Sequence, residues 1–187
     1  HIACDLTDAE RTRAVLLERR PEAVIHAQAL SDVDRCEREP ELAAAMNVRT
    51  VANLVQALRA TKSVLIAVST DYVFDGTKGV PYDESDEPHP VNTYGRSKLD
   101  GERVALAYDA SVVVRPSTLF GPGRMNFCDH IVACVQRGET IDAFADQVTS
   151  PTYTEDLADG IAGLLAAIDR SSIPRLPSRI FHLANAG

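Results

Sequence analysis

Short apolar runs rich in β-branched residues alternate along this chain with longer segments in which apolar residues recur at helical spacing. Strands that are apolar throughout are typical of parallel sheets, because helices cover both faces of such a sheet. The strand-like runs are 23–29, 63–69, 111–115, 140–144 and 180–183, and the helix-like segments are 41–59, 93–107, 127–137 and 154–168. This alternation predicts an α/β fold with a doubly wound parallel sheet.

The segment Thr70–Pro90 fits neither pattern and is rich in Gly, Pro, Asp and Thr. Loops of this length are usually functional, and open parallel sheets bind ligands at the carboxyl ends of their strands. We therefore expect this loop to shape a site. The 187 residues are long enough to bury one core and show no internal repeat, so we expect a single domain. The stretch 170–178, with two prolines and three serines, is interpreted as a surface loop.

Composition narrows the classes of partner. A formal net charge of −8 argues against nucleic acid and against anionic membrane surfaces, which need a basic face. No apolar run approaches the ~20 residues of a membrane span, and the start of the chain does not resemble a signal peptide. The four cysteines show no metal-binding or disulfide pattern, so we expect no metal site and reduced thiols. These features predict a cytoplasmic protein with a small-molecule partner.

Tyr94 and Lys98 belong to the sequence YGRSK at the start of a predicted helix. Their i to i+4 spacing places both side chains on one helix face. A tyrosine with its ordinary pKa of about 10 is a poor proton donor or acceptor at neutral pH, and a nearby ammonium lowers that pKa. The spacing alone is common on surface helices. It gains weight from Thr70, whose hydroxyl follows the strand 63–69 at the carboxyl edge of the sheet, although Ser69 and Thr70 could also be simple turn residues.

Four ordered motifs then carry a resemblance to a known family. They are STDYVFDG from Ser69, PVNTYGRSKLDGE from Pro90, RPSTLFGPGRMNF from Arg115 and DQVTSPTYTEDLA from Asp146. Together with residues 22–41 they resemble the dTDP-4-dehydrorhamnose reductase family of extended short-chain dehydrogenases/reductases. The resemblance implies an NAD(P)-binding Rossmann-type domain over residues 1–187, with substrate-side elements from about residue 118 onward.

By this resemblance, Thr70, Tyr94 and Lys98 match the catalytic threonine, tyrosine and lysine. The implied activity is an oxidoreductase reaction, hydride transfer from NADPH or NADH to a nucleotide-linked 4-keto sugar, as in dTDP-rhamnose biosynthesis. Tyr94 would protonate the developing alkoxide and Thr70 would hydrogen-bond that oxygen. Lys98 would hold the cofactor ribose and lower the pKa of Tyr94.

The resemblance also implies which residues bind the cofactor and the substrate. The implied cofactor contacts, besides Tyr94 and Lys98, are Asp5 and Leu6 at the adenine, Ala27, Gln28 and Ala29 at a strand end, Asn47 and Arg115. The implied substrate contacts, besides Thr70, are Asp71, Thr118 and Asn126. Two positions depart from the family pattern. Gln28 stands where the family favours a small apolar residue, and Thr118 stands where these reductases usually carry a tryptophan.

Three alternatives to the reductase can be considered, of which Tyr72 argues against the first. A 4,6-dehydratase would carry a glutamate after the Thr-Asp pair, where this chain has Tyr72, whereas a nucleotide-sugar epimerase stays open. The third is a non-catalytic regulatory subunit like the beta subunit of methionine adenosyltransferase, which resembles the same family and shares its motifs. The resemblance leaves a homodimer open as an assembly.

Other features are interpreted from context. No glycine-rich turn precedes His26, so by the resemblance we expect roughly 40 residues with a βαβ start before His1, and most of a substrate lobe after Gly187. His26 and His182 are interpreted as core histidines with satisfied hydrogen bonds. The acidic run 83–87 is interpreted as solvated surface.

Overall fold

The computed structural model describes residues 1–123, 125–141, 148–168 and 172–185. The chain divides into two compact units. The first unit comprises His1–Arg115 and Ile168–His182, and the second comprises Pro116–Ala167 and Leu183–Gly187. Each unit is described by itself. That both belong to one NAD(P)-binding domain stays a prediction.

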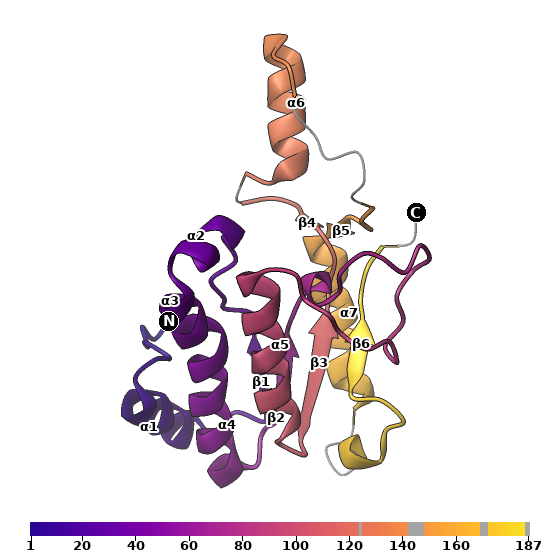
Figure 1. Ribbon diagram of the computed structural model, residues 1–187. Helices are drawn as coiled ribbons and strands as arrows, with labels where there is room; N and C mark the ends of the chain where they lie inside the picture. The colour runs from indigo at the N-terminus through magenta and orange to yellow at the C-terminus, as the bar shows by residue number, and fades with distance from the viewer. Residues whose placement is uncertain (124, 142–147, 169–171, 186–187) are drawn as a thin grey trace. The chain divides into compact units, whose positions relative to one another are not determined.

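A four-stranded parallel sheet forms the centre of the first unit (Figure 1). Its strands, in spatial order, are β1 (Ala23–His26), β2 (Val64–Val68), β3 (Ser111–Arg115) and β6 (Ile180–His182). All three pairings are parallel, with Ile25 opposite Ile66 and Ile66 opposite Val112. The expected parallel sheet is confirmed. β2 and β3 are its buried central strands, which explains their unbroken apolar sequences.

β1 differs from the expectation of a buried strand over 23–29. It ends at His26, and it is the edge strand of the sheet that the structure describes. Ile25 in this strand is 49% exposed. Residues Ala27, Gln28 and Ala29 follow the strand as irregular backbone, so they lie at its carboxyl end.

The helices of the first unit are α1 (Ala9–Arg19), α2 (Val33–Arg38), α3 (Pro40–Ala44), α4 (Thr50–Thr61) and α5 (Thr93–Leu106). Pro40 occupies the first turn of α3, as expected, where a missing N–H costs nothing. The helix expected over 41–59 is present but contains a π-helical segment, Ala45–Arg49, between α3 and α4. Such insertions often occur at functional sites. α4 and α5 pack on β2 and β3 through Leu54, Leu58, Leu65, Ala105 and Val113, and α1 packs against α4.

The second unit contains α6 (Phe127–Arg137), α7 (Thr154–Ala167) and a pair of two-residue parallel strands, β4 (Leu119–Phe120) and β5 (Thr152–Tyr153). α6 has the predicted bounds. It begins with a capping box between Asn126 and Asp129 and ends at Gly138, whose φ of 65° lies in the left-handed region that glycine favours. The strand expected over 140–144 lies mainly outside the described residues.

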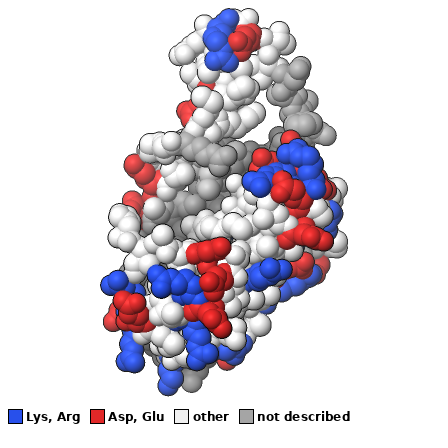
Figure 2. All heavy atoms as spheres, turned by 90° about the vertical axis from the view of Figure 1, so that its left-hand side faces the viewer, with Lys and Arg blue, Asp and Glu red and all other residues white. Residues whose placement is uncertain are grey.

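The segment 170–178 was interpreted as a surface loop. Its first two residues, Arg170 and Ser171, lie outside the described residues, and the rest contains a short 3₁₀ helix, Ile173–Arg175. Ile173 is fully buried, so this part of the segment contributes to the core rather than only to the surface. On the face shown in Figure 2, basic and acidic side chains are interspersed. No helix among the described residues is long and apolar enough to cross a membrane.

Candidate active site

Two side chains, the amide of Asn92 and the carboxylate of Glu37, accept hydrogen bonds from the first turn of α5. The Asn92 side chain accepts a hydrogen bond from the Gly95 N–H at 2.7 Å. Glu37, from α2, accepts hydrogen bonds from the Thr93 N–H at 2.5 Å and from the Thr93 hydroxyl at 2.8 Å. Acceptors at this end satisfy the free N–H groups of the first helical turn. They hold in place the turn that carries Tyr94.

At two glycines, the backbone of α5 lies closer to neighbouring backbone than any residue with a side chain would allow. A Cβ atom at Gly95 would overlap the carbonyl oxygen of Tyr72, and one at Gly101 would overlap the carbonyl oxygen of Asn47. Both glycines therefore permit backbone-to-backbone contact on the face of α5 that carries Tyr94 and Lys98. Those two side chains are buried, as their shared helix face predicts.

Thr70 joins Tyr94 at the end of β2. The Thr70 hydroxyl accepts from the Tyr72 N–H at 3.2 Å and donates to Asp71 Oδ1 at 3.2 Å, and its proximity to the Tyr94 phenol lowers the pKa of that phenol. Thr70 is thus both the cap of the 3₁₀ turn Asp71–Val73 and a neighbour of the tyrosine. The geometry shows the turn role of Thr70, and its catalytic role stays a prediction.

Lys98 does not act on Tyr94 as the sequence suggested. Its Nζ donates a hydrogen bond to the main-chain oxygen of Val68 at 2.8 Å. Burial lowers the pKa of Lys98 to about 8, an effect that the Glu102 carboxylate opposes. Burial also raises the pKa of Tyr94 to about 12, although the nearby Thr70 hydroxyl lowers it. The expected lowering of the Tyr94 pKa is therefore wrong for this structure, because desolvation of the phenolate outweighs the effect of Thr70 and the nearby Asp71 raises the pKa further.

Asn47, within the π-helical segment, supports α5 through hydrogen bonds within the protein. Its Oδ1 accepts from the Leu30 N–H at 2.8 Å, and its Nδ2 donates to the Leu30 carbonyl at 3.1 Å and to the Ser97 hydroxyl at 2.9 Å. Ser97 in turn donates to the carbonyl oxygen of Tyr94 at 2.8 Å. Both amide hydrogens of Asn47 are thus engaged within the protein. The side chain links the loop after β1 to the turn that carries the tyrosine, and Ser97 is a member of the site that sequence reasoning missed.

Arg115, the last residue of β3, is also engaged within the protein. Its Nε and Nη2 donate to the two carboxylate oxygens of Glu102 at 2.9 and 2.6 Å. Its guanidinium lies over the Phe74 ring, 5.1 Å from the centroid. The side chain therefore faces α5 and Phe74, and only Nη1 lacks a partner among the described residues.

Asp5 and Leu6 precede α1. One carboxylate oxygen of Asp5 accepts from the Thr7 N–H at 2.8 Å and from the Thr7 hydroxyl at 2.7 Å, and these bonds lower the pKa of Asp5. Leu6 packs against the core, and its carbonyl accepts from Asn53 Nδ2 at 2.8 Å. The pair forms a fixed turn with an exposed carboxylate, which is compatible with the predicted adenine contact.

Several buried polar atoms beyond the ends of β1 and β2 have no hydrogen-bond partner within the described part of the chain. They are His26 Nε2, Ser69 Oγ and both amide atoms of Gln28. His26 is buried, as expected, but its hydrogen bonds are not satisfied, which corrects that expectation. Burial, together with the charge of Lys98, lowers the pKa of His26 to about 4, so it is neutral at pH 7. Buried polar groups are rarely left unpaired, so this set of donors and acceptors fits a polar ligand such as a dinucleotide.

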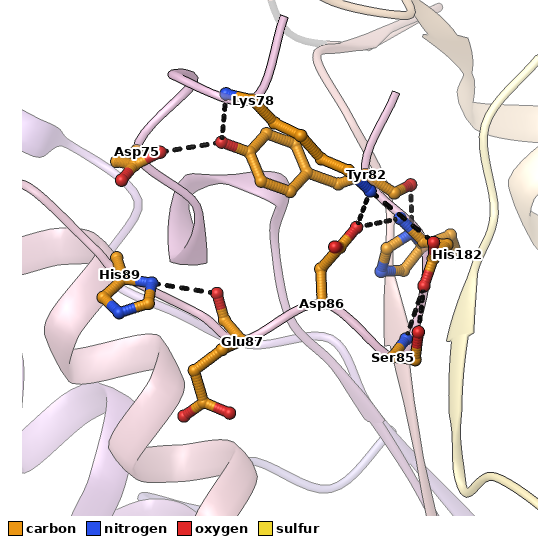
Figure 3. A network of polar contacts seen from close by, with 9 residues as sticks. Asp75, Lys78, Tyr82, Ser85, Asp86, Glu87, His89 and His182 are labelled. Carbon is orange, nitrogen blue, oxygen red and sulfur yellow. Dashed lines mark hydrogen bonds and ion pairs between the residues drawn. The ribbon is translucent and has the colours of Figure 1, made fainter. Parts of the chain in front are cut away.

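The loop after Phe74 is held by a network of its own (Figure 3). Tyr82 stacks on Phe74 with ring centroids 4.2 Å apart and donates to Asp75 at 2.7 Å. Within the acidic run, Asp86 forms an ion pair with Lys78, and Glu84 accepts from the His182 N–H at 3.0 Å. The run is therefore a structural part of the loop and not only solvated surface. His182 Nδ1 lies 3.3 Å from the Tyr82 carbonyl, whereas its Nε2 has no partner among the described residues.

Two predicted substrate residues belong to the second unit. The Thr118 carbonyl accepts from the Thr152 N–H at 2.9 Å, which joins β4 to β5. Asn126 caps α6 and donates to the Gly121 carbonyl at 3.3 Å. Asn126 also lines an open cavity of about 530 Å³, together with Phe120, Met125, Asp129 and Tyr153.

Comparison with known proteins places this geometry in context. Residues 1–187 match the family model described as RmlD substrate binding domain. Over 185 residues the chain is 38% identical to a dTDP-4-dehydrorhamnose reductase of Streptomyces griseus, covering 98% of this chain and 60% of that protein. Over 199 residues it is 35% identical to a probable dTDP-4,6-dihydroxy-2-methyloxan-3-one 4-ketoreductase of Streptomyces antibioticus, covering 100% of this chain and 68% of that protein.

Among solved structures, the dTDP-4-dehydrorhamnose reductase from Bacillus anthracis in complex with NADP matches with a TM-score of 0.88 and 33% identity. That match covers 98% of this chain and 63% of the other. The chain thus spans about 60% of the length of the first of its curated relatives. Its parallel sheet and the arrangement of its described helices agree with a Rossmann-type fold.

Proposed function

The chain belongs to the RmlD substrate binding domain family, and on that premise we propose that the full-length protein is an NAD(P)H-dependent reductase of a nucleotide-linked 4-keto sugar. The observations that support the proposal are that Thr70, which follows β2, lies near the Tyr94 phenol and that Lys98 donates a hydrogen bond to Val68 at the end of the same strand. The relatives named above support it, since each carries the name of a reductase acting on a dTDP-linked sugar. Their names favour the reductase over an epimerase or a regulatory subunit.

The cofactor we propose is NADPH or NADH, which when bound supplies the hydride for reduction of the keto carbon. The Bacillus anthracis relative is described in complex with NADP, which supports this choice. The unpaired polar atoms of Gln28 and Ser69 would hydrogen-bond the cofactor, and Lys98 would contact its ribose. Ala27 and Ala29 beside Gln28 leave room for close approach, and Asp5 with Leu6 would contact the adenine. Asn47 and Arg115 would support the site indirectly, since their side chains bond to Ser97 and Glu102 of α5.

Tyr94 is proposed to donate a proton to the substrate oxygen as the carbonyl becomes a hydroxyl. Because the pKa of Tyr94 is raised to about 12, the phenol is protonated at neutral pH. Reduction requires a protonated acid, but a phenol with this raised pKa is a weak one, so the proposal requires the bound cofactor and substrate to lower the pKa of Tyr94. Thr70 lies near the phenol and can share the substrate oxygen. We further propose that Asp71, Thr118 and Asn126 contact the nucleotide sugar.

A direct test offers the full-length protein a panel of nucleotide 4-keto sugars while following the nicotinamide absorbance. We expect oxidation of NADPH or NADH with at least one member of the panel. Cofactor binding without turnover on any member would instead support the regulatory subunit. We also propose a cytoplasmic location, consistent with four cysteines that are free thiols, and a homodimer stays a prediction.

A further inference from the structure

Glu102 of α5 and Arg115 at the end of β3 form a buried ion pair. Both side chains are only 2% exposed, and the two hydrogen bonds between them are bidentate. Removing two charges from water costs several kcal/mol per ion, and apolar residues of similar size often serve stability equally well. A gain in the stability of the fold therefore does not explain why a buried ion pair occurs here, and the residues around it suggest a different role.

Those surroundings include Lys98. Glu102 lies four residues after Lys98 on α5, so both side chains emerge from the same face of the helix, and both are buried. Arg115 comes from the end of β3, whose Val114 is paired with Val68 of β2, and Val68 supplies the carbonyl that holds the Lys98 ammonium. The ion pair and the lysine thus meet where α5 covers the ends of two central strands.

The charges that face Lys98 come from each element around it. His26, at the end of β1, is neutral at pH 7 because its pKa is lowered to about 4. Tyr94, one turn earlier on α5, is neutral because its pKa is raised. The Val68 carbonyl contributes a dipole. Glu102 is the acidic group that raises the pKa of Lys98 within the described residues, and its ion pair with Arg115 fixes the position of the carboxylate.

We propose that Glu102 and Arg115 are positioning residues for Lys98. Arg115 fixes the Glu102 carboxylate one helical turn from the lysine, and this carboxylate keeps the buried Lys98 in its charged form, seated on the Val68 carbonyl. Without the carboxylate, burial alone would favour a neutral amine, which cannot serve as a cationic anchor for the cofactor ribose. The inference rests on the proposed function, since it assigns the pair to the lysine of that site.

The test compares two double variants of the full-length protein. Glu102→Gln with Arg115→Gln removes both charges and leaves two amides that can hydrogen-bond each other. A single change at Glu102 would leave Arg115 as an unpaired buried charge, so the neutral double variant is preferred. The matched control is Asp100→Asn with Arg103→Gln, an ion pair of 2.8 Å on the exposed side of the same helix.

The readout is an NMR titration of the Lys98 Nζ group without substrate, with the signal assigned through Lys98→Arg. We expect the Glu102/Arg115 variant to move the Lys98 midpoint to lower pH by about one unit, and the control to leave it unchanged. The cofactor dissociation constant at pH 8 should rise several-fold in the first variant only. A folded variant with an unchanged Lys98 midpoint would overturn the proposal.

If the double variant does not fold, Glu102→Asp provides a second route. It retains the charge but withdraws the carboxylate by one methylene, and a shift of the midpoint in the same direction supports the proposal, whereas no shift overturns it. Because the titration needs no turnover, its outcome is separate from that of the proposed function. A shifted midpoint in a protein that reduces no 4-keto sugar would refute the reductase and leave the positioning role standing.

Discussion

The Lys98 ammonium donates a hydrogen bond to the carbonyl oxygen of Val68, the last residue of β2, at 2.8 Å. This bond ties the helix that carries Tyr94 to the central strand that ends at Thr70. The same bond holds a charged group away from water. The position of Lys98 is therefore sensitive to pH, and the direction of that sensitivity follows from its pKa.

Stability should rise with pH through the titration of Lys98. The folded-state pKa is about 8, below the ordinary value of 10.5, so between these two pH values the unfolded chain binds more protons than the folded one. Below pH 8 the lysine is charged in both states, and the full cost of burying the charge is present. As pH rises through 8, the folded protein loses this proton first and the cost is relieved.

Urea unfolding of the wild type and of Lys98→Met at several pH values measures this effect. We expect the free energy of unfolding of the wild type to increase relative to that of Lys98→Met between about pH 8 and 10. Two curves that stay parallel over this range would show that Lys98 has an ordinary pKa in the folded state.

Replacing Tyr94 with phenylalanine should abolish most turnover without weakening cofactor binding. The ring and its packing remain, and only the proton donor is lost. We expect kcat to fall by about 10²–10⁴-fold, the usual contribution of general acid catalysis. Tyr82→Phe is the matched control, because it removes a phenol that bonds Asp75 in the loop network. An unchanged kcat in Tyr94→Phe would exclude this tyrosine as the acid.

The two glycines Gly101 and Gly163 should respond in opposite ways to the same substitution. A Cβ at Gly101 would overlap the Asn47 carbonyl, so Gly101→Ala must push α5 away from the π-helical segment. We expect a loss of about 1–3 kcal/mol in unfolding free energy. Gly163, in α7, has no atom within 4 Å of an added Cβ. There alanine should stabilise by about 0.5–1 kcal/mol through its helix propensity. Thermal unfolding of both variants tests the pair, and equal effects would contradict it.

The fold was predictable where a single pattern decided it. β3 and α6 have the expected bounds, and α5 ends one residue early, because unbroken apolar runs and helical spacing report burial directly. β1 was expected to be longer, since small and apolar residues continue past His26, but its pairing with β2 ends at His26. The two-residue strands β4 and β5 are too short to carry any periodic signal.

The placement of the candidate site residues was predictable in part, whereas their charge states were not, and the roles of these residues stay a prediction. The spacing of Tyr94 and Lys98 fixed their common face, and the position of Thr70 after a strand brought it to the same edge. Whether desolvation or a neighbouring charge controls the pKa of Tyr94 depends on burial, which the sequence does not contain. The Glu102–Arg115 pair joins a helix to a strand end, so only the tertiary structure brings its two members together. The sequence did contain a signal for Arg115, because a charged residue directly follows the apolar residues of the run SVVVR.

Replacing Gln28 with alanine should change the stability of the protein and its affinity for NADPH in opposite directions. Both amide atoms of Gln28 are buried without a hydrogen-bond partner among the described residues, and each unpaired buried group costs about 1–3 kcal/mol. Gln28→Ala removes that cost, so the free protein should melt at a higher temperature. If the cofactor is the partner of the amide, the same variant should bind NADPH about tenfold more weakly, and NADPH should raise its melting temperature less than it raises that of the wild type. Gln56→Ala, an exposed glutamine on α4, is the control and should change neither quantity. A less stable Gln28→Ala with unchanged NADPH affinity would show that the amide has its partner within the protein.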